Sequence, residues 1–201
     1  CGLMPWWRSR CWGVPHLVLE PGLLKQPQLL LEFCEAQSGW GQRPALLSLV
    51  PTQLGRLLAD PSGIDWLQRF SVIWVGGAAL PAVMADQARQ VGIRLAPCYG
   101  ATETAAMVAA LPPERFLQGD ASCGTPLMDV ALRLAADGAL EVKTSRLAIA
   151  CWRPEQPQQL QGLSDASGWW RSGDRAVLEG DLHILGRLDG AVLSGGETVF
   201  P

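Results

Sequence analysis

The apolar positions in the first half of the chain form short continuous runs separated by helically spaced ones. Residues 45–50, 71–75 and 93–96 are apolar along most of their length, which is typical of strands buried on both faces. Residues 51–58 carry leucines at helical spacing behind a proline that suits a first turn, and residues 81–91 also predict a helix. This alternation predicts an α/β fold with a mostly parallel, layered sheet flanked by helices.

The pattern changes on either side of this region. Residues 1–44 are rich in tryptophan and proline and predict one clear helix, near residues 26–37. After about residue 120, short strand-like segments flank turn dipeptides, which predicts a small antiparallel, β-barrel-like subdomain. The expected strands are 130–135 and 139–144 around Asp137-Gly138, 176–179 and 182–185 around Gly180-Asp181, and 146–152, with an exposed loop over 153–168.

Composition and charge narrow the class of protein. The 201 residues are 48% hydrophobic and 17% charged, as in soluble globular domains. A net charge of −3 leaves no basic face, which argues against nucleic acid as a partner. No apolar run approaches the roughly 20 residues of a membrane span, and no secretory leader is recognisable. We therefore expect a cytoplasmic protein without stable membrane insertion.

The cysteines do not predict a metal site. All six, at positions 1, 11, 34, 98, 123 and 151, stand apart from one another without C-x-x-C spacing. His16 and His183 are close to none of them in the sequence, which argues against zinc. Reduced thiols in a cytoplasmic protein are the expectation.

Glycines and polar side chains follow two of the predicted strands. Gly76, Gly77 and Ala78 come after the second, where backbone without bulky side chains can approach a flat ligand, although an ordinary tight turn has the same sequence. The only tyrosine, Tyr99, follows the third strand, and its ring can either stack on a purine or be a half-buried aromatic at a strand end.

Four further polar side chains suit a nucleotide. Thr102 offers a hydroxyl to a phosphate and Glu103 a carboxylate to Mg²⁺, although both also suit the cap of a helix. Asp174 can accept hydrogen bonds from both hydroxyls of a ribose, or be a turn aspartate. Arg187 can bind an anion or lie on the surface.

Three motifs then occur in a fixed order: Tyr-Gly-Ala-Thr-Glu-Thr at 99–104, Trp-Arg-Ser-Gly-Asp at 170–174, and Gly-Arg-Leu-Asp at 186–189 running into Ser-Gly-Gly-Glu at 194–197. In this order they resemble the adenylate-forming (ANL) superfamily of acyl-CoA ligases, luciferases and peptide-synthetase adenylation domains. The resemblance implies that ATP activates a carboxylic acid as an acyl-adenylate, with AMP as leaving group.

The resemblance also implies roles for individual residues. One set of residues is expected to contact ATP or AMP: Gly76, Gly77, Ala78, Tyr99, Gly100, Asp174 and Arg187. Thr102 is expected to contact the α-phosphate, and Glu103 to bind Mg²⁺. Asp189 is expected to be a hinge between domains.

Within the superfamily the chain is most similar to the o-succinylbenzoate–CoA ligases of menaquinone and phylloquinone biosynthesis. Residues 48–54 and 56–58, the ending from 186 to 201, and the short segment between Glu103 and Asp174 carry this similarity. It implies a carboxylic acid, ATP and coenzyme A as small-molecule partners, and a homodimer is among the expectations. There are two alternatives. One is another aryl- or fatty-acid–CoA ligase, and the other is a degenerate nucleotide-binding module without catalysis.

Two parts of the superfamily pattern are missing. Neither the Ser/Thr/Gly-rich phosphate loop with its lysine nor a matching catalytic lysine occurs, and the lysines present, Lys25 and Lys143, stand in other contexts. Because the chain begins at Cys1 and ends at Pro201, we interpret it as a piece of the large N-terminal domain of a longer protein. The expected parts are an α/β subdomain at 1–120, a β subdomain at 121–186 and a hinge at 187–201 before an absent C-terminal domain. Alone, such a piece is expected to be nearly inactive.

Overall fold

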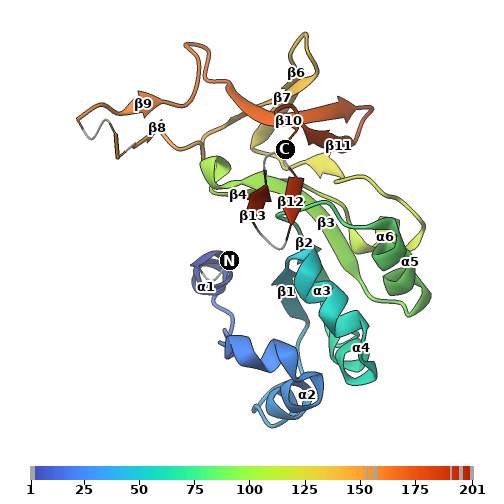
Figure 1. Ribbon diagram of the computed structural model, residues 1–201. Helices are drawn as coiled ribbons and strands as arrows, with labels where there is room; N and C mark the ends of the chain where they lie inside the picture. The colour runs from blue at the N-terminus through green and yellow to red at the C-terminus, as the bar shows by residue number, and fades with distance from the viewer. Residues whose placement is uncertain (1–2, 153, 156–157, 191, 195–196, 200–201) are drawn as a thin grey trace. The chain divides into compact units, whose positions relative to one another are not determined.

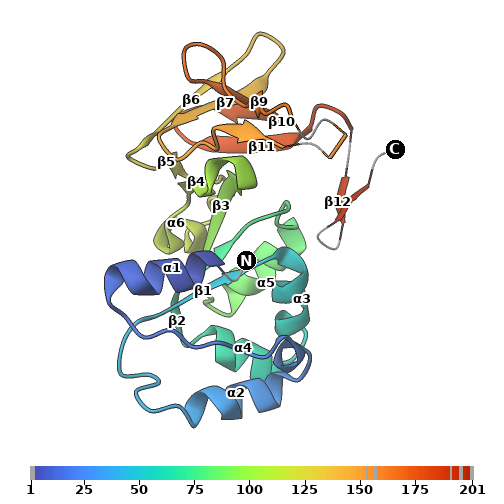
Figure 2. The same cartoon turned by 90° about the vertical axis from the view of Figure 1, so that its left-hand side faces the viewer.

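The structure is a computed structural model that describes residues 3–152, 154–155, 158–190, 192–194 and 197–199. The chain divides into two compact units, whose elements are labelled in Figures 1 and 2. The first unit comprises residues 1–97 with 112–121, and the second comprises residues 98–111 with 122–201. The second unit therefore takes in residues 98–111, which precede residue 120.

The strands of the first unit run parallel, as the sequence predicts. Strand β1 (Ala45–Leu49) pairs in parallel with β2 (Phe70–Val75), and β2 pairs in parallel with the start of β3 (Leu95–Ala101). Ile73 and Leu95 stand opposite each other in this register, and both are fully buried. The continuous apolar runs of β2 and β3 reflect this burial, whereas Leu46 of β1 remains 43% exposed.

Prolines begin several helices of the first unit, where a first turn does not need the missing N–H. Helix α4 is additionally capped by Asp60, whose Oδ1 accepts hydrogen bonds from the backbone N–H of Ser62 at 2.8 Å and of Gly63 at 3.3 Å. The helices are α1 (Leu3–Trp12), the 3₁₀ turn η1 (Pro21–Lys25), α2 (Pro27–Glu35), α3 (Pro51–Leu58), α4 (Pro61–Leu67), α5 (Ala82–Gln90) and α6 (Pro113–Leu117).

Trp66 lies at the centre of the first unit's core and is fully buried. Its indole N–H lies 3.2 Å from Cys34 Sγ, and its ring meets Phe70 edge-on with 4.7 Å between centroids. Burial raises the pKa of the Cys34 thiol, so this cysteine is a neutral core residue. The five cysteines in the described part of the chain are free thiols.

Helix α1 was not predicted. Its tryptophans Trp6, Trp7 and Trp12 remain 45%, 55% and 53% exposed, so the helix shows no apolar stripe that a sequence pattern could reveal. A cation–π contact holds it instead, because the Arg8 guanidinium lies 4.8 Å from the centre of the Trp74 ring on β2.

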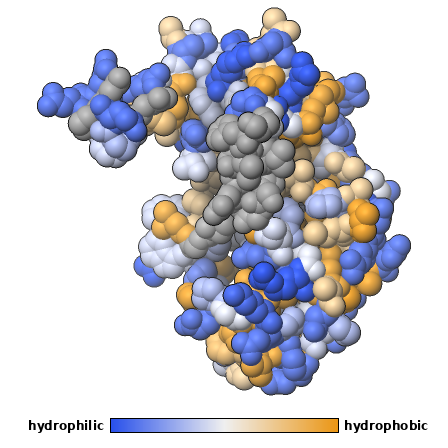
Figure 3. Space-filling view, viewed as in Figure 1, coloured by the Kyte–Doolittle hydropathy of each residue, from blue (hydrophilic) through white to orange (hydrophobic). Residues whose placement is uncertain are grey.

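In Figure 3, orange apolar residues also lie among blue ones over α2, where Leu29 and Phe33 are partly exposed.

The second unit is antiparallel. The end of β3 pairs with β4 (Ala106–Ala110), and β4 pairs with β5 (Thr125–Pro126). A four-stranded sheet has the order β11-β10-β7-β6. Its strands are β6 (Val130–Leu134), β7 (Ala139–Thr144), β10 (Trp170–Leu178) and β11 (Leu182–Arg187). Two short pairs complete the described strands: β8 (Ala150–Cys151) with β9 (Gln161–Gly162), and β12 (Val192–Ser194) with β13 (Glu197–Val199).

A separate core holds the second unit together. Val108, Leu140, Val142 and Leu182 are fully buried within it, and Tyr99 packs against its edge. Two layers of sheet therefore share one set of apolar side chains. The expected α/β class with a small antiparallel, partly barrel-like subdomain is confirmed.

Both predicted hairpins are confirmed, and one predicted strand is wrong over most of its length. Gly138 and Gly180 occupy the two turns at φ of +82° and +85°, a conformation that glycine adopts without strain. Of residues 146–152, only Ala150–Cys151 is a strand. The chain turns away at Arg146, whose backbone N–H donates to Thr144 Oγ1 at 3.3 Å. None of the helices that the structure describes is long and apolar enough to cross a bilayer.

Candidate functional site

Tyr99 and Asp174 meet in the second unit. Tyr99 lies in the part of β3 that belongs to the second unit, and its hydroxyl donates a hydrogen bond of 2.5 Å to Asp174 Oδ2 on β10. Burial raises the pKa of Tyr99 well above its usual value, and the bond to Asp174 raises it further. The phenol therefore keeps its proton and remains a donor. The backbone N–H of Asp174 in turn donates to Ser172 Oγ at 3.2 Å.

Arg187, on β11, brings positive charge to the same carboxylate. Its Nη1 lies 3.7 Å from Asp174 Oδ1, while Nη2 and Nε donate to the two carboxylate oxygens of Asp189 at 2.7 and 3.2 Å. Gly173 makes room for this side chain, because a Cβ at that position would lie 2.8 Å from Arg187 Nη2. The structure thus brings together Asp174, Arg187 and Asp189, all predicted site residues.

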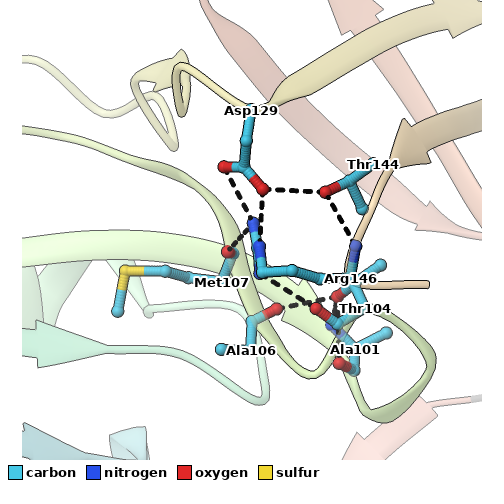
Figure 4. Close-up of polar contacts among 7 residues, drawn as sticks. All are labelled: Ala101, Thr104, Ala106, Met107, Asp129, Thr144 and Arg146. Carbon is cyan, nitrogen blue, oxygen red and sulfur yellow. Dashed lines mark hydrogen bonds and ion pairs between the residues drawn. The ribbon is translucent and has the colours of Figure 1, made fainter. Parts of the chain in front are cut away.

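Thr102 and Glu103 lie in the 3₁₀ turn η2 (Thr102–Thr104), which joins β3 to β4. Thr102 is exposed and Glu103 is half-buried, whereas Thr104, which was not predicted as a site residue, is fully buried. Thr104 Oγ1 donates to the Ala106 carbonyl at 2.7 Å and accepts from the Ala101 N–H at 3.0 Å, as Figure 4 shows. These bonds fix the turn on its buried residue, Thr104, and leave Thr102 exposed and Glu103 half-buried.

Gly100 has a steric role in β3, just before this turn. A Cβ on Gly100 would lie 2.3 Å from the carbonyl oxygen of Ala106 and 2.5 Å from the Cα of Met107. Both contacts are with backbone, which cannot move aside like a flexible side chain. The close approach of β3 to β4 beside Tyr99 therefore requires glycine.

Gly76, Gly77 and Ala78 lie in the first unit, between β2 and α5. The Gly76 N–H donates to the Leu49 carbonyl at 3.3 Å, and Gly77 has a φ of +84°, which favours glycine. This geometry agrees with the tight turn after a buried strand that the sequence indicates. A separate open depression of about 550 Å³, lined by residues such as Met128, Lys143 and Gly168, contains none of the predicted site residues.

A magnesium ion brought by a nucleotide fits the residues at η2. Within the described ranges, no group of three or more His, Cys, Asp and Glu side chains gathers as a metal cage. Mg²⁺ commonly takes only one or two protein carboxylates and completes its shell with phosphate oxygens and water. The single carboxylate of Glu103 therefore suits a metal–nucleotide complex better than a permanently bound ion.

Comparison with known proteins identifies the family. The profile of the AMP-binding enzymes, described as "AMP-binding enzyme", matches residues 2–145. The chain belongs to this family. The matched part includes the first-unit glycines and the turn with Thr102 and Glu103, while Asp174, Arg187 and Asp189 lie beyond it. The assignment of these last three depends on the motifs and on the geometry described above.

Among curated AMP-binding relatives, the chain is similar to 2-succinylbenzoate–CoA ligases, also called o-succinylbenzoate–CoA ligases. It is 36% identical over 155 residues to that of Escherichia coli K12, which covers 77% of this chain and 32% of that protein. It is 30% identical over 202 residues to that of Listeria monocytogenes, which covers 100% of this chain and 41% of that protein. The chain thus spans about a third of the length of the first of these relatives.

Solved structures agree with this assignment to the AMP-binding family. An arginine-to-lysine variant of E. coli MenE with bound OSB-AMS superposes with a TM-score of 0.62 at 32% identity, over 86% of this chain and 35% of that one. The Bacillus subtilis enzyme in complex with ATP and magnesium ion gives 0.59 at 26% identity, over 78% and 34%. A further B. subtilis MenE structure gives 0.71 at 23% identity, which supports the fold alone.

Three residues at this site were missed by sequence reasoning: Thr104, Asp129 and Arg146. Thr104 stands inside the recognised motif, but its buried hydroxyl bonds only the protein's own backbone. Arg146 donates to the carbonyl oxygen of Thr104, and a carbonyl acceptor has no signature in a sequence. Because a strand was predicted over 146–152, the turn that contains Arg146 was not expected.

Proposed function

We propose that the protein is an ATP-dependent acid–CoA ligase that acts through an acyl-adenylate, with o-succinylbenzoate as the acid. The similarity to 2-succinylbenzoate–CoA ligases supports the substrate. The observation that carries the proposal is the constellation of Tyr99, Asp174 and Arg187, because it offers an aromatic ring, a carboxylate and a cation at one place. Those are the groups that an adenine nucleotide needs.

Asp174 is proposed to bind the ribose. A carboxylate has roughly four acceptor positions, and Tyr99 occupies one of them, so enough remain for the two ribose hydroxyls. The Tyr99 ring would stack on adenine beside Gly100. Gly76, Gly77 and Ala78 of the first unit are proposed as further contacts of ATP or AMP, as the resemblance to the superfamily implies. Arg187 would contact the ribose or the phosphates.

Thr102 and Glu103 are proposed to serve the phosphate end of ATP. The Thr102 hydroxyl would donate to an α-phosphate oxygen, and Glu103 would hold the Mg²⁺ that accompanies the nucleotide. That ion would offset the phosphate charge as the acid approaches. Both residues belong to a turn whose backbone is fixed by the buried Thr104, and Thr102 is exposed to a ligand.

The proposed reaction has two half-reactions. A carboxylate oxygen of the acid forms a bond to the α-phosphorus of ATP, and pyrophosphate leaves with the electron pair of the broken P–O bond. The thiol sulfur of coenzyme A, having lost its proton to solvent, then bonds to the acyl carbon, and AMP leaves. Asp189 is proposed as the hinge about which a C-terminal domain rotates between the two half-reactions. It lies in a proposed hinge region, 187–201, which follows an α/β part (1–120) and a β part (121–186).

The partners in this proposal are the acid, ATP and coenzyme A, in the cytoplasm, where free thiols persist. The test is thioester formation by the full gene product, with ATP and coenzyme A and a panel of o-succinylbenzoate, benzoate and a fatty acid. Preference for o-succinylbenzoate supports the proposal. Turnover only with the other acids would make it a different acid–CoA ligase. No turnover with any acid would favour a nucleotide-binding module without catalysis.

A further inference from the structure

The Arg146 side chain joins three backbone or carboxylate groups in the second unit. Its Nη1 donates to the Thr104 carbonyl at 2.9 Å and its Nη2 to the Met107 carbonyl at 3.3 Å. Its Nε donates to Asp129 Oδ2 at 2.7 Å. Figure 4 shows the guanidinium between the turn η2 and Asp129. An arginine thereby links the turn that carries Thr102 and Glu103 to the turn between β5 and β6, where Asp129 lies.

Asp129 is itself held in place. Thr144 Oγ1, at the end of β7, donates to Asp129 Oδ2 at 2.8 Å. The hydrogen bond from Arg146 lowers the pKa of Asp129 most, followed by the bond from Thr144, so the carboxylate stays charged near neutral pH. Arginine suits this position because its planar fork of donors serves several acceptors at once, which a lysine cannot do.

A second contact from the same segment holds the neighbouring residue of the turn. The backbone N–H of Ala148 donates to the Glu103 carbonyl at 2.8 Å. Residues Arg146 and Ala148 therefore bind two successive carbonyls of η2, those of Thr104 and Glu103. The turn needs such support, because Ala105 directly after it has a φ of +58°, a left-handed conformation that costs energy in any residue but glycine.

The Glu103 carboxylate has no comparable support of its own. Among the residues that the structure describes, no ion pair or side-chain hydrogen bond holds it. The direction of the side chain therefore depends on the backbone from which it starts. Fixing the carbonyls of Glu103 and Thr104 is the way in which this fold can fix the carboxylate.

We propose that Arg146 is a positioning residue that fixes the turn η2, and that it thereby sets the affinity for the magnesium–nucleotide complex. The inference rests on the proposed function of Thr102 and Glu103. Arg146 touches neither the nucleotide nor the metal in this proposal. It acts through the Thr104 and Met107 carbonyls, with Asp129 holding its guanidinium.

The test compares Arg146→Met with a matched control, Arg133→Met, in the full gene product. Arg133 also forms an ion pair within the second unit, with Glu141 at 2.5 Å, and its other described partners are Asp165 and the Trp169 ring, neither of which is in η2. The measurement is the Mg²⁺ concentration that half-saturates binding of a non-hydrolysable ATP analogue, which requires no turnover. We expect Arg146→Met to raise it about tenfold and Arg133→Met to leave it near the wild-type value. Arg146→Lys should fall between them.

Hydrogen exchange provides the second readout, and it serves if Arg146→Met does not fold. In Arg146→Lys, the amides of 101–107 should exchange faster than in wild type, while those of β10 should not change. Unchanged Mg²⁺ dependence in the Arg146 variants, or an equal change in Arg133→Met, would overturn the positioning role while leaving the proposed function intact. If the wild-type protein itself bound no magnesium–nucleotide, the proposed function would fall, and this inference with it.

Discussion

The Tyr99 hydroxyl donates a hydrogen bond to the Asp174 carboxylate although the two residues lie 75 positions apart in the chain. The bond joins the end of β3 to β10 within the second unit, and it places an aromatic ring beside an acceptor. The effects of this bond on stability and on nucleotide binding can be measured separately, because unfolding is measured on the protein alone and binding is measured with a nucleotide.

Tyr99→Phe removes the hydroxyl and keeps the ring. We expect a loss of about 1–2 kcal/mol in the free energy of unfolding, because the bond is partly buried and its acceptor is charged. ATP affinity should fall only a few-fold, since stacking on the ring is retained, whereas Tyr99→Ala should lose at least ten times more. Urea denaturation and calorimetric titration check both. Equal affinities for the Phe and Ala variants would contradict the stacking role.

Stability should decline at alkaline pH through the same residue. The pKa of Tyr99 is raised in the fold, first by burial and then by the bond to Asp174, from an ordinary value of 10. A raised pKa means that the folded state holds the proton more tightly, so its contribution is full below pH 10 and declines as pH rises above it. The free energy of unfolding should therefore fall above pH 10 in wild type, and fall less steeply in Tyr99→Phe.

This chain offers a direct control for that titration. The tyrosinate absorbance of wild type minus that of Tyr99→Phe, both measured on the full gene product, reports this residue alone. The absorbance change should occur at higher pH in the native chain than in the urea-unfolded chain. Coincident titrations in the two states would refute the predicted pH dependence.

Two glycines should respond differently to alanine. Gly100→Ala places a Cβ against the backbone of Ala106 and Met107, which cannot give way, so it should destabilise the protein by about 1–3 kcal/mol. Gly173→Ala meets only the far end of the Arg187 side chain, which can move aside at little cost. It should lower nucleotide affinity more than stability. Thermal unfolding and ATP titration of both variants distinguish these outcomes, and equal destabilisation would contradict the account.

Asp189→Pro tests the proposed hinge. Proline fixes φ, so it should hinder a rotation about this position while leaving the first half-reaction possible. We expect adenylate formation to be largely retained and thioester formation from the adenylate to fall at least about tenfold. Because Asp189 also bonds Arg187, Asp189→Asn serves as the control. If Asp189→Asn slowed the second half-reaction equally, the effect would come from that contact and the hinge would be refuted.

The sequence revealed those parts of the fold that depend on local chemistry. The turns at Gly138 and Gly180 follow from dipeptides that favour hairpins, and the buried strands follow from continuous apolar runs. Helix α1 was missed because its tryptophans form no stripe. The strand predicted from residue 146 was mostly wrong because the chain turns at Arg146, where the backbone N–H bonds the Thr144 hydroxyl.

The site was predictable in its residues but not in its connections. Motif order pointed to Tyr99, Glu103 and Asp174 individually. It could not reveal that Tyr99 bonds Asp174, because the packing of β3 and β10 against the same core is a property of the tertiary structure. Nor could it reveal Arg146, whose acceptors are carbonyl groups that every residue possesses.

The most direct test of the central claim is o-succinylbenzoate-dependent exchange of label between pyrophosphate and ATP, which reports acyl-adenylate formation without coenzyme A. The full gene product should catalyse this exchange, and Asp174→Ala should lower kcat/KM for ATP at least about tenfold. Asp137→Ala, which removes an exposed aspartate paired with Arg171 in the same unit, should not. Exchange that survives unchanged in Asp174→Ala, or a wild-type protein that catalyses none with this acid, would contradict the account.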